Sequence, residues 1–287
     1  MKKLRSFTRL IRLERALTAV FGVIFTGVIV GDLVTVQPEY ILACLVVFFS
    51  AVANFALNDY SDIEIDRLNH RLDRPLAQGQ IRPRTALIVS VASSMFAFIL
   101  SLFLNPIPRL MIIIGLPLSL VYNLSLKKHL LLKNVFVGLA YVGVVLMSAL
   151  VSDAVLEPLA LYLAVIGFFF SLSYEVMLDI ADIEGDRTLG VNTLPNRLGS
   201  RNAAWFSILI GAGTIIANPL PFFIRIDPRL FGDYLFLALI LLPIINRLRI
   251  YKSLLDDQSP ENVLNLKKRL FRNLRLGGLC YLIGSLV

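Results

Sequence analysis

The sequence predicts an all-α membrane protein, a polytopic bundle of nine transmembrane helices. Of its 287 residues, 57% are hydrophobic and only 17% are charged, whereas soluble domains are about half apolar and about a quarter charged. The apolar residues form long runs, and a helix of about 20 such residues crosses a bilayer core about 30 Å thick. The runs are too long and unbroken for barrel strands, so helices must satisfy the backbone hydrogen bonds in lipid.

The predicted spans follow one another along the whole chain, and we expect residues 1–287 to form one integral-membrane domain. The last run is the shortest and predicts at most a partial span. The first run is preceded by basic residues without a clear small-residue cleavage site, so we expect it to be retained. In order, the nine runs cover roughly residues 16–31, 39–57, 85–104, 107–125, 134–152, 157–178, 203–224, 230–246 and 274–287.

The basic residues predict the orientation of this bundle. If successive connections alternate sides, all Lys and Arg residues fall on one side except Arg109, Arg225 and Arg229. Cytoplasmic loops carry the Lys/Arg excess, so we expect a cytoplasmic N-terminus in a multi-pass cell-membrane protein. The net charge of +8 is then explained by topology and attraction to anionic lipids, without a nucleic-acid partner.

Two acidic segments interrupt this apolar chain, after the second and the sixth predicted spans, and therefore both on the cytoplasmic side. Their cores are nearly identical, "DIEIDR" at 62–67 and "DIEGDR" at 182–187. On a helix, residues spaced i, i+3 and i+7 share one face. Each segment contains one triplet with this spacing: Asp59, Asp62 and Asp66 in the first, and Asp179, Asp182 and Asp186 in the second.

Three like charges on one helical face repel one another, and the repulsion grows near a low-dielectric medium. The simplest structural interpretation is a solvated acidic loop, but that does not require the same spacing twice. The functional interpretation is a divalent-cation site. Mg²⁺ prefers carboxylate oxygens and is commonly completed by substrate phosphates, so two facing clusters predict a Mg²⁺–diphosphate site.

A diphosphate also requires cationic side chains. Arginine binds phosphate oxygens in a bidentate manner, whereas lysine acts more as a point charge. Taken singly, each basic residue is better explained as a cytoplasmic anchor than as a ligand, but interleaving with the acidic segments favours a binding role for Arg67, Arg74 and Lys127. The candidates interleaved with the acidic segments or lying on the same side are Arg67, Arg74, Arg187, Lys127, Lys128, and Arg12 and Arg15 at the first span.

These motifs resemble the UbiA-type superfamily of intramembrane prenyltransferases, whose signatures are N-D-x-x-D-x-x-x-D and a second D-x-x-x-D. Here they read "NDYSDIEID", which begins at Asn58, and "DIADIEGD", followed by "DRPLAQGQI" and "GVNTLPNRLG". Tyr122 and Lys127 resemble a Tyr/Lys motif of the family, with a spacing one residue looser. The resemblance implies that Asn58 and the six aspartates hold Mg²⁺, and that Asp62, Asp66, Asp182, Tyr122 and Lys127 take part in catalysis.

The resemblance further implies transfer of a prenyl group from a polyprenyl diphosphate to a lipophilic acceptor, with no obligatory protein partner evident. The motifs look most like the archaeal ether-lipid branch, which moves a geranylgeranyl group onto geranylgeranylglyceryl phosphate. Aromatic acceptors of the hydroxybenzoate, naphthoate, homogentisate or chlorophyllide type are the alternative. A cation transporter would place acids near the middle of its spans, where they are nearly absent here. The D-G and A-R pattern of CDP-alcohol phosphotransferases is not found.

Overall fold

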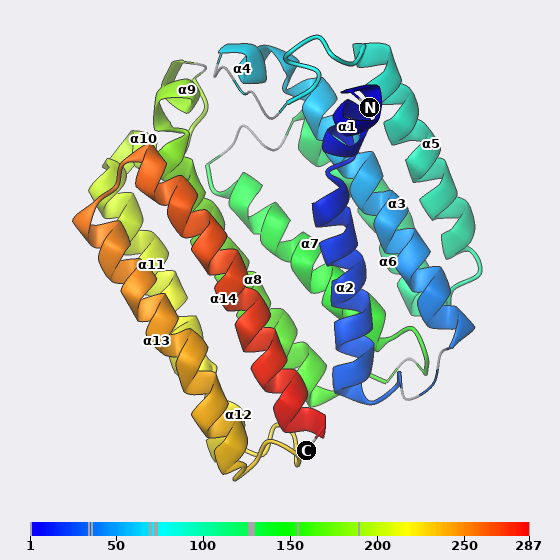
Figure 1. Ribbon diagram of the computed structural model, residues 1–287. Coiled ribbons are helices and arrows are strands. Elements are labelled where there is room, and N and C mark those ends of the chain that lie inside the picture. Colours follow the sequence, from blue (N-terminus) through cyan, green and yellow to red (C-terminus); the bar gives the residue numbers. More distant parts are fainter. Residues whose placement is uncertain are drawn as a thin grey trace. The chain divides into compact units, whose positions relative to one another are not determined.

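A computed structural model describes residues 2–33, 35, 37–68, 71, 74–125, 130–153, 155–188 and 190–286. Every regular element in these ranges is a helix (Figure 1). The helices are α1 (Lys2–Leu10), α2 (Leu13–Val30), α3 (Pro38–Ser61), α4 (Ile63–Leu68), α5 (Pro83–Ser101), α6 (Pro106–Leu124), α7 (Leu132–Ala149), α8 (Pro158–Ala181), α9 (Ile183–Thr188), α10 (Leu194–Leu198), α11 (Ser200–Ala217), α12 (Leu220–Phe223), α13 (Tyr234–Asp256) and α14 (Pro260–Leu286).

Eight stretches of the described chain are long and apolar enough to cross a membrane, which makes this a multi-pass membrane protein. They correspond to the first eight predicted spans. Four begin with a proline at the first helical position, in α3, α5, α6 and α8. Proline fits there because its fixed φ suits a helix and the first amide has no intrahelical partner. The sequence thus determines where these spans start.

The predicted boundaries fail where a helix continues into polar sequence. The predicted eighth span ends at residue 246, whereas α13 continues to Asp256. The predicted ninth span is the C-terminal half of α14, which starts at Pro260. Hydropathy detects only the apolar part of a helix, whereas backbone hydrogen bonding continues the same helix into polar sequence. The count of nine spans stays a prediction.

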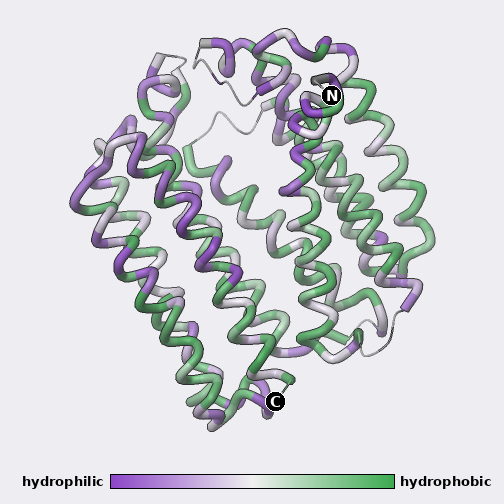
Figure 2. The backbone as a smooth tube through the Cα atoms, in the orientation of Figure 1, coloured by the Kyte–Doolittle hydropathy of each residue, from purple (hydrophilic) through white to green (hydrophobic). Residues whose placement is uncertain are grey.

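The chain groups into two compact units, which are described separately: Met1–Lys127 with Gly143–Leu156, and Lys128–Val142 with Glu157–Val287. In the first unit, α3 packs along α5, where the Ser90 hydroxyl donates to the Ala53 carbonyl at 2.9 Å. Apolar residues colour α3 and α5, and hydrophilic residues gather at α1 and α4 (Figure 2). Large apolar side chains of α5, such as Ile88 and Met95, are more than half exposed, as expected for helices that face lipid.

In the second unit, α8 packs against α11 at very short range. The hydroxyls of Ser173 and Ser207 each donate to the other residue's carbonyl, at 2.8 and 2.7 Å. A Cβ at Gly211 would lie 1.7 Å from the Tyr251 hydroxyl. Small residues that let helices approach and hydroxyls that bond across them are typical of helix packing in membranes.

Candidate active site

The two acidic triplets share a backbone shape that differs from the one predicted. Asp62 separates α3 from α4 with φ −104° and ψ 9°, and Asp182 separates α8 from α9 with φ −99° and ψ 6°. These values lie in the sparsely populated bridge region, where many active-site residues are found. One amide hydrogen bond spans each break, from Asp66 to Asp62 at 2.8 Å and from Asp186 to Asp182 at 2.9 Å. The spacing had predicted that the three carboxylates of each triplet share one face of a continuous helix. The break at the middle aspartate shows that they do not.

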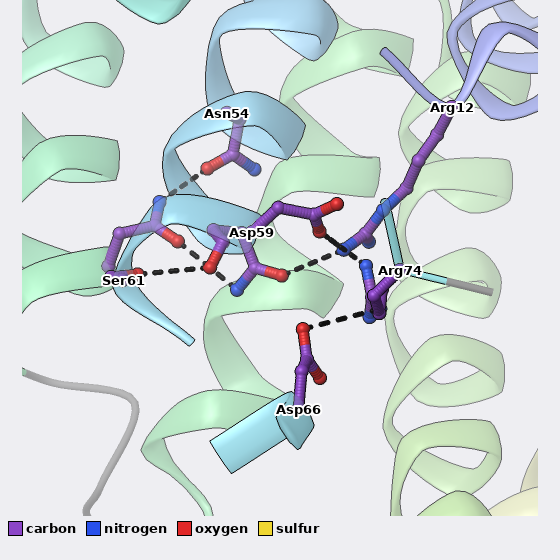
Figure 3. Close-up of polar contacts among 8 residues, drawn as sticks. Arg12, Asn54, Asp59, Ser61, Asp66 and Arg74 are labelled. Carbon is purple, nitrogen blue, oxygen red and sulfur yellow. Dashed lines mark hydrogen bonds and ion pairs between the residues drawn. The ribbon is translucent and has the colours of Figure 1, made fainter. Parts of the chain in front are cut away.

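In the first triplet, Asp59 is held by two arginines (Figure 3). Its Oδ1 accepts from Arg12 Nη2 at 2.6 Å and from Arg74 Nη1 at 2.5 Å. The Asp59 side chain is 1% exposed, and the two arginine side chains are 14% and 15% exposed. Arg74 also lies 3.6 Å from Asp66, measured from Nε to Oδ2. Arg74, predicted to bind diphosphate, therefore links two carboxylates of the triplet.

Asn58 is positioned by a chain of side-chain hydrogen bonds between α3 and α6. Its Oδ1 accepts from Arg12 at 2.9 Å, and its Nδ2 donates to Asn123 at 3.3 Å. Asn123 donates in turn to Asn54 at 2.5 Å, and the Ser119 hydroxyl donates to the same Asn54 oxygen at 2.9 Å. Buried polar groups that are bonded in this way are rigid, so the amide of Asn58 has a defined orientation.

The position of Asp66 shows how strongly these charges interact. Burial first, and then the carboxylates of Asp62 and Asp59, raise the pKa of Asp66 to about 7, although Arg71 and Arg12 act in the opposite direction. Like charges disfavour the ionised form of a carboxyl group. A divalent cation among these oxygens would relieve the repulsion.

In the second triplet, Asp179 is held by a lysine and an amide from α7. Lys133 Nζ donates to Oδ1 at 2.5 Å, and Asn134 Nδ2 donates to Oδ2 at 2.9 Å. Asp179 is 2% exposed and Asp186 is 8% exposed, whereas Asp182 is only partly buried. In both triplets, then, the first aspartate is a buried partner of a cation and the middle aspartate is more accessible.

The remaining predicted residues fall into three groups. Arg67 and Arg187 are exposed in the last turns of α4 and α9. Tyr122 is a buried residue of α6, 6% exposed. Lys127 and Lys128 lie outside the described residues. The roles predicted for all five stay predictions.

A cavity of about 210 Å³ is lined by Arg9, Arg12, Arg15 and Arg74, and it adjoins the first triplet through Arg12 and Arg74, which bond Asp59. We call it the arginine cavity. Burial lowers the pKa of Arg12, and the charge of Arg15 lowers it as well, while Asp59 opposes this shift. Arg15 was predicted as a phosphate ligand, but nothing in the sequence had singled out Arg9.

Sequence reasoning also missed the two partners of the buried Asp179, which both come from α7. Lys133 was counted only as one of many cytoplasmic basic residues. A usable signal was present, because Lys133 and Asn134 begin a span in "LLLKN", and an ionisable residue within a span is usually functional. Its partner Asp179 lies 46 residues away, so the pairing itself could not be inferred.

The chemistry of the donor set fits Mg²⁺. Both triplets offer hard oxygen ligands, carboxylates together with the Asn58 amide, and neither includes a His or Cys. Such donors suit Mg²⁺, which keeps several waters and binds phosphates. The triplets belong to different units, so the prediction that they face each other stays a prediction.

Comparisons with known proteins agree with these motifs. Residues 16–269 match the UbiA prenyltransferase family. A protein of Methanococcus aeolicus named digeranylgeranylglyceryl phosphate synthase is 30% identical over 286 residues, which cover 99% of both chains. A solved structure described as a digeranylgeranylglyceryl phosphate synthase is 27% identical, with a TM-score of 0.77 and 99% of both chains covered. A UbiA homologue from Archaeoglobus fulgidus, solved with DMAPP and Mg²⁺, is 18% identical with a TM-score of 0.67, over 96% of this chain and 99% of that one, and supports the fold alone.

Proposed function

The chain belongs to the UbiA prenyltransferase family, and from this premise we propose that it transfers a geranylgeranyl group from its diphosphate to geranylgeranylglyceryl phosphate, a step of ether-lipid synthesis. One observation carries the choice of acceptor: a relative with the name of that activity matches this chain from end to end. The membrane helices fit an enzyme whose donor and acceptor are both lipids.

We assign the two acidic triplets to the donor diphosphate. Bound Mg²⁺ supplies neutralisation of the leaving diphosphate. The carboxylates of Asp62, Asp66, Asp182 and Asp186, with the Asn58 amide, would hold it. Hard oxygen donors and the crowding of charge around Asp66 support this assignment.

We assign a different role to the first aspartate of each triplet. Asp59 and Asp179 were predicted as metal ligands, but both are buried and bonded to cations. A carboxylate held in this way fixes the orientation of the helix end that carries the next two aspartates. We therefore propose that both act as positioning residues, whether or not an oxygen also reaches the metal.

The basic side chains complete the diphosphate site in this proposal. The C–O bond of the donor breaks, and the diphosphate leaves with the electron pair. The acceptor hydroxyl oxygen then attacks the freed carbon, and its proton passes to the departed diphosphate. Preorganised cations at the developing charge stabilise such a transition state, and apolar spans exclude water from the allylic carbon. The cations proposed to contact the diphosphate are Arg67, Arg187, Lys127 and Lys128, with Tyr122 beside the reacting carbon.

Sidedness follows from the same proposal. The basic residues gather with the acidic triplets on one predicted side, so we place the N-terminus and both triplets in the cytoplasm, within a nine-span, single-domain protein of the cell membrane. A donor and a metal ion supplied from the cytosol are consistent with this orientation.

An acceptor screen tests the proposal. Purified protein is incubated with Mg²⁺ and labelled geranylgeranyl diphosphate, and is offered either geranylgeranylglyceryl phosphate or a panel of hydroxybenzoate, naphthoate and homogentisate acceptors. We expect labelled lipid only with the glyceryl phosphate, and none from the Asp62→Asn variant. Labelling of an aromatic acid in place of the lipid would assign the chain to an aromatic-acceptor branch.

A further inference from the structure

We propose that the arginine cavity binds the phosphate group of the acceptor lipid, as an anion site separate from the one that holds the donor diphosphate. The inference rests on the proposed function, and it names the feature that would select a phosphorylated acceptor. It is built from side chains of the first unit alone.

The charge of the cavity calls for an anion. Arg12 and Arg74 already contact the first triplet, but no carboxylate among the described residues pairs with the side chain of Arg9 or Arg15. Four guanidinium groups line one space, and Asp59 and Asp66 pair only with Arg12 and Arg74, so the exposed Arg9 and Arg15 leave a net positive charge there. Arginine binds phosphate oxygens through two parallel hydrogen bonds, so a phosphate is the natural occupant.

The backbone is bent in a way that assembles this cavity. Arg12 has φ 44° and ψ 53° at the junction of α1 and α2, a left-handed conformation that is unfavourable for a residue with a Cβ. Strain of this kind persists where the surrounding structure enforces it, and such positions cluster at ligand sites. The bend brings Arg9 from α1 and Arg15 from α2 to the same space, beside Arg12 itself.

The cavity suits a metal-free phosphate better than a diphosphate with Mg²⁺. Its lining is cationic, so it repels the metal that the carboxylates attract. Its volume of about 210 Å³ has room for one phosphate group. Arg12 and Arg74 connect its lining to Asp59 and Asp66, so the cavity lies next to the proposed donor site, where an acceptor headgroup must lie.

A membrane phospholipid is the competing source of a phosphate. A second cavity of about 390 Å³ shares Arg9 and is otherwise lined by Lys3, Arg5, Ser6 and Gln80. Most of these residues belong to α1. This helix also exposes Leu4 and Phe7, as an interfacial amphipathic helix does. We favour the acceptor for the arginine cavity because its two deeper arginines contact the acidic triplet, whereas a bilayer headgroup needs no such contact.

The kinetic test uses Arg9→Ala and Arg15→Ala in the full chain, with Arg84→Ala as the control. Arg84 is an exposed arginine in the first turn of α5, so the control removes the same charge elsewhere in the same unit. We expect each cavity variant to raise the KM for geranylgeranylglyceryl phosphate about tenfold or more, the usual effect of losing one charge-assisted hydrogen bond. The KM for geranylgeranyl diphosphate should stay within about twofold. Equal changes in both KM values, or in Arg84→Ala, would overturn the proposal.

A binding test keeps this proposal separate from the proposed function. Melting temperatures are measured without Mg²⁺ or donor, in the presence of an alkylglycerol phosphate, the matching alkylglycerol, or phosphatidylglycerol. A ligand that binds the folded state raises the melting temperature, so we expect stabilisation by the phosphate monoester only, and its loss in Arg9→Ala and Arg15→Ala. No difference between phosphate and alcohol would refute the anion site. Equal stabilisation by phosphatidylglycerol would assign the cavity to membrane lipid. Both outcomes can be read even if no acceptor is turned over.

Discussion

The ion pair between Lys133 and Asp179 gives the sharpest prediction about stability. Replacing Lys133 by Met leaves Asp179, whose side chain is 3% exposed, without the cation that lies 2.5 Å away. Breaking a buried ion pair by removing one partner costs about 3–5 kcal/mol. The Lys133 side chain is 26% exposed, so water screens part of the loss, and we expect a decrease of about 3 kcal/mol in unfolding free energy.

A double-mutant cycle assigns this loss to the pair. Asp179→Asn removes the buried charge and keeps an oxygen that can accept from Asn134. The double variant Lys133→Met/Asp179→Asn should therefore be more stable than Lys133→Met alone, with a coupling of about 1 kcal/mol or more. The assay is denaturant unfolding in detergent micelles without Mg²⁺, followed by tryptophan or circular-dichroism signals.

The control for this cycle is Lys252→Met, at an exposed lysine of α13 in the same unit. It removes one charge and adds the same apolar side chain, but it breaks no ion pair among the residues that the structure describes. We expect a change within about 0.5 kcal/mol, as is usual for exposed sites. If Lys133→Met and Lys252→Met lower stability equally, or if adding Asp179→Asn gives no recovery, the buried pair does not hold the helix end as we infer.

Three further predictions concern the metal site and one distant ion pair. Asp62→Asn or Asp182→Asn should lower turnover by about 10²-fold, as loss of one preorganised transition-state group does, while the melting temperature stays near that of the parent. If both variants release diphosphate at the parental rate, the triplets are acidic loops without a catalytic role. Chelation of divalent cations should abolish prenyl transfer, and added Mg²⁺ should restore it, whereas full activity after exhaustive chelation would exclude the metal site. Burial alone would raise the pKa of Asp227, but hydrogen bonds from Arg229 outweigh burial and lower the pKa below its usual 3.8. The ion pair should therefore stabilise the fold fully above about pH 4, and this stabilisation should be lost in more acidic solution. The melting temperatures of the parent and Asp227→Asn should then differ by more at pH 6 than at pH 3, and a constant difference would contradict this linkage.

The sequence allowed the membrane-spanning helices to be predicted because their cause is local. Length and apolarity determine whether a helix can lie in lipid, and proline at the first position of α3 or α8 marks its start. The C-terminal part of α13 and the start of α14 were missed because hydrogen bonding extends a helix beyond its apolar part. The two acidic triplets were identified for an equally local reason, since their spacing repeats almost letter for letter.

The partners of the buried aspartates could not be predicted, because they depend on tertiary structure. Arg12 lies 47 residues before Asp59, and the chain offers many basic residues that are equally plausible partners. Counting Lys and Arg for topology treats them as interchangeable, whereas packing distinguishes the few that enter the site. The left-handed conformation of Arg12 could not be predicted either, because such a conformation is usually signalled by glycine and this position holds an arginine.

The two triplets differ in what surrounds them and agree in their backbone. Asp59 is bonded to two arginines from other segments, whereas Asp179 is bonded to a lysine and an amide from α7. Despite these different partners, the backbone breaks at the middle aspartate with dihedral angles that agree within about 5°. Because the break recurs with nearly the same short sequence although the bonded partners differ, a local cause in that sequence is favoured. We infer that the shared requirement is the direction in which the second and third carboxylates leave the helix end, and that the first aspartate needs only some cation to hold that end in place.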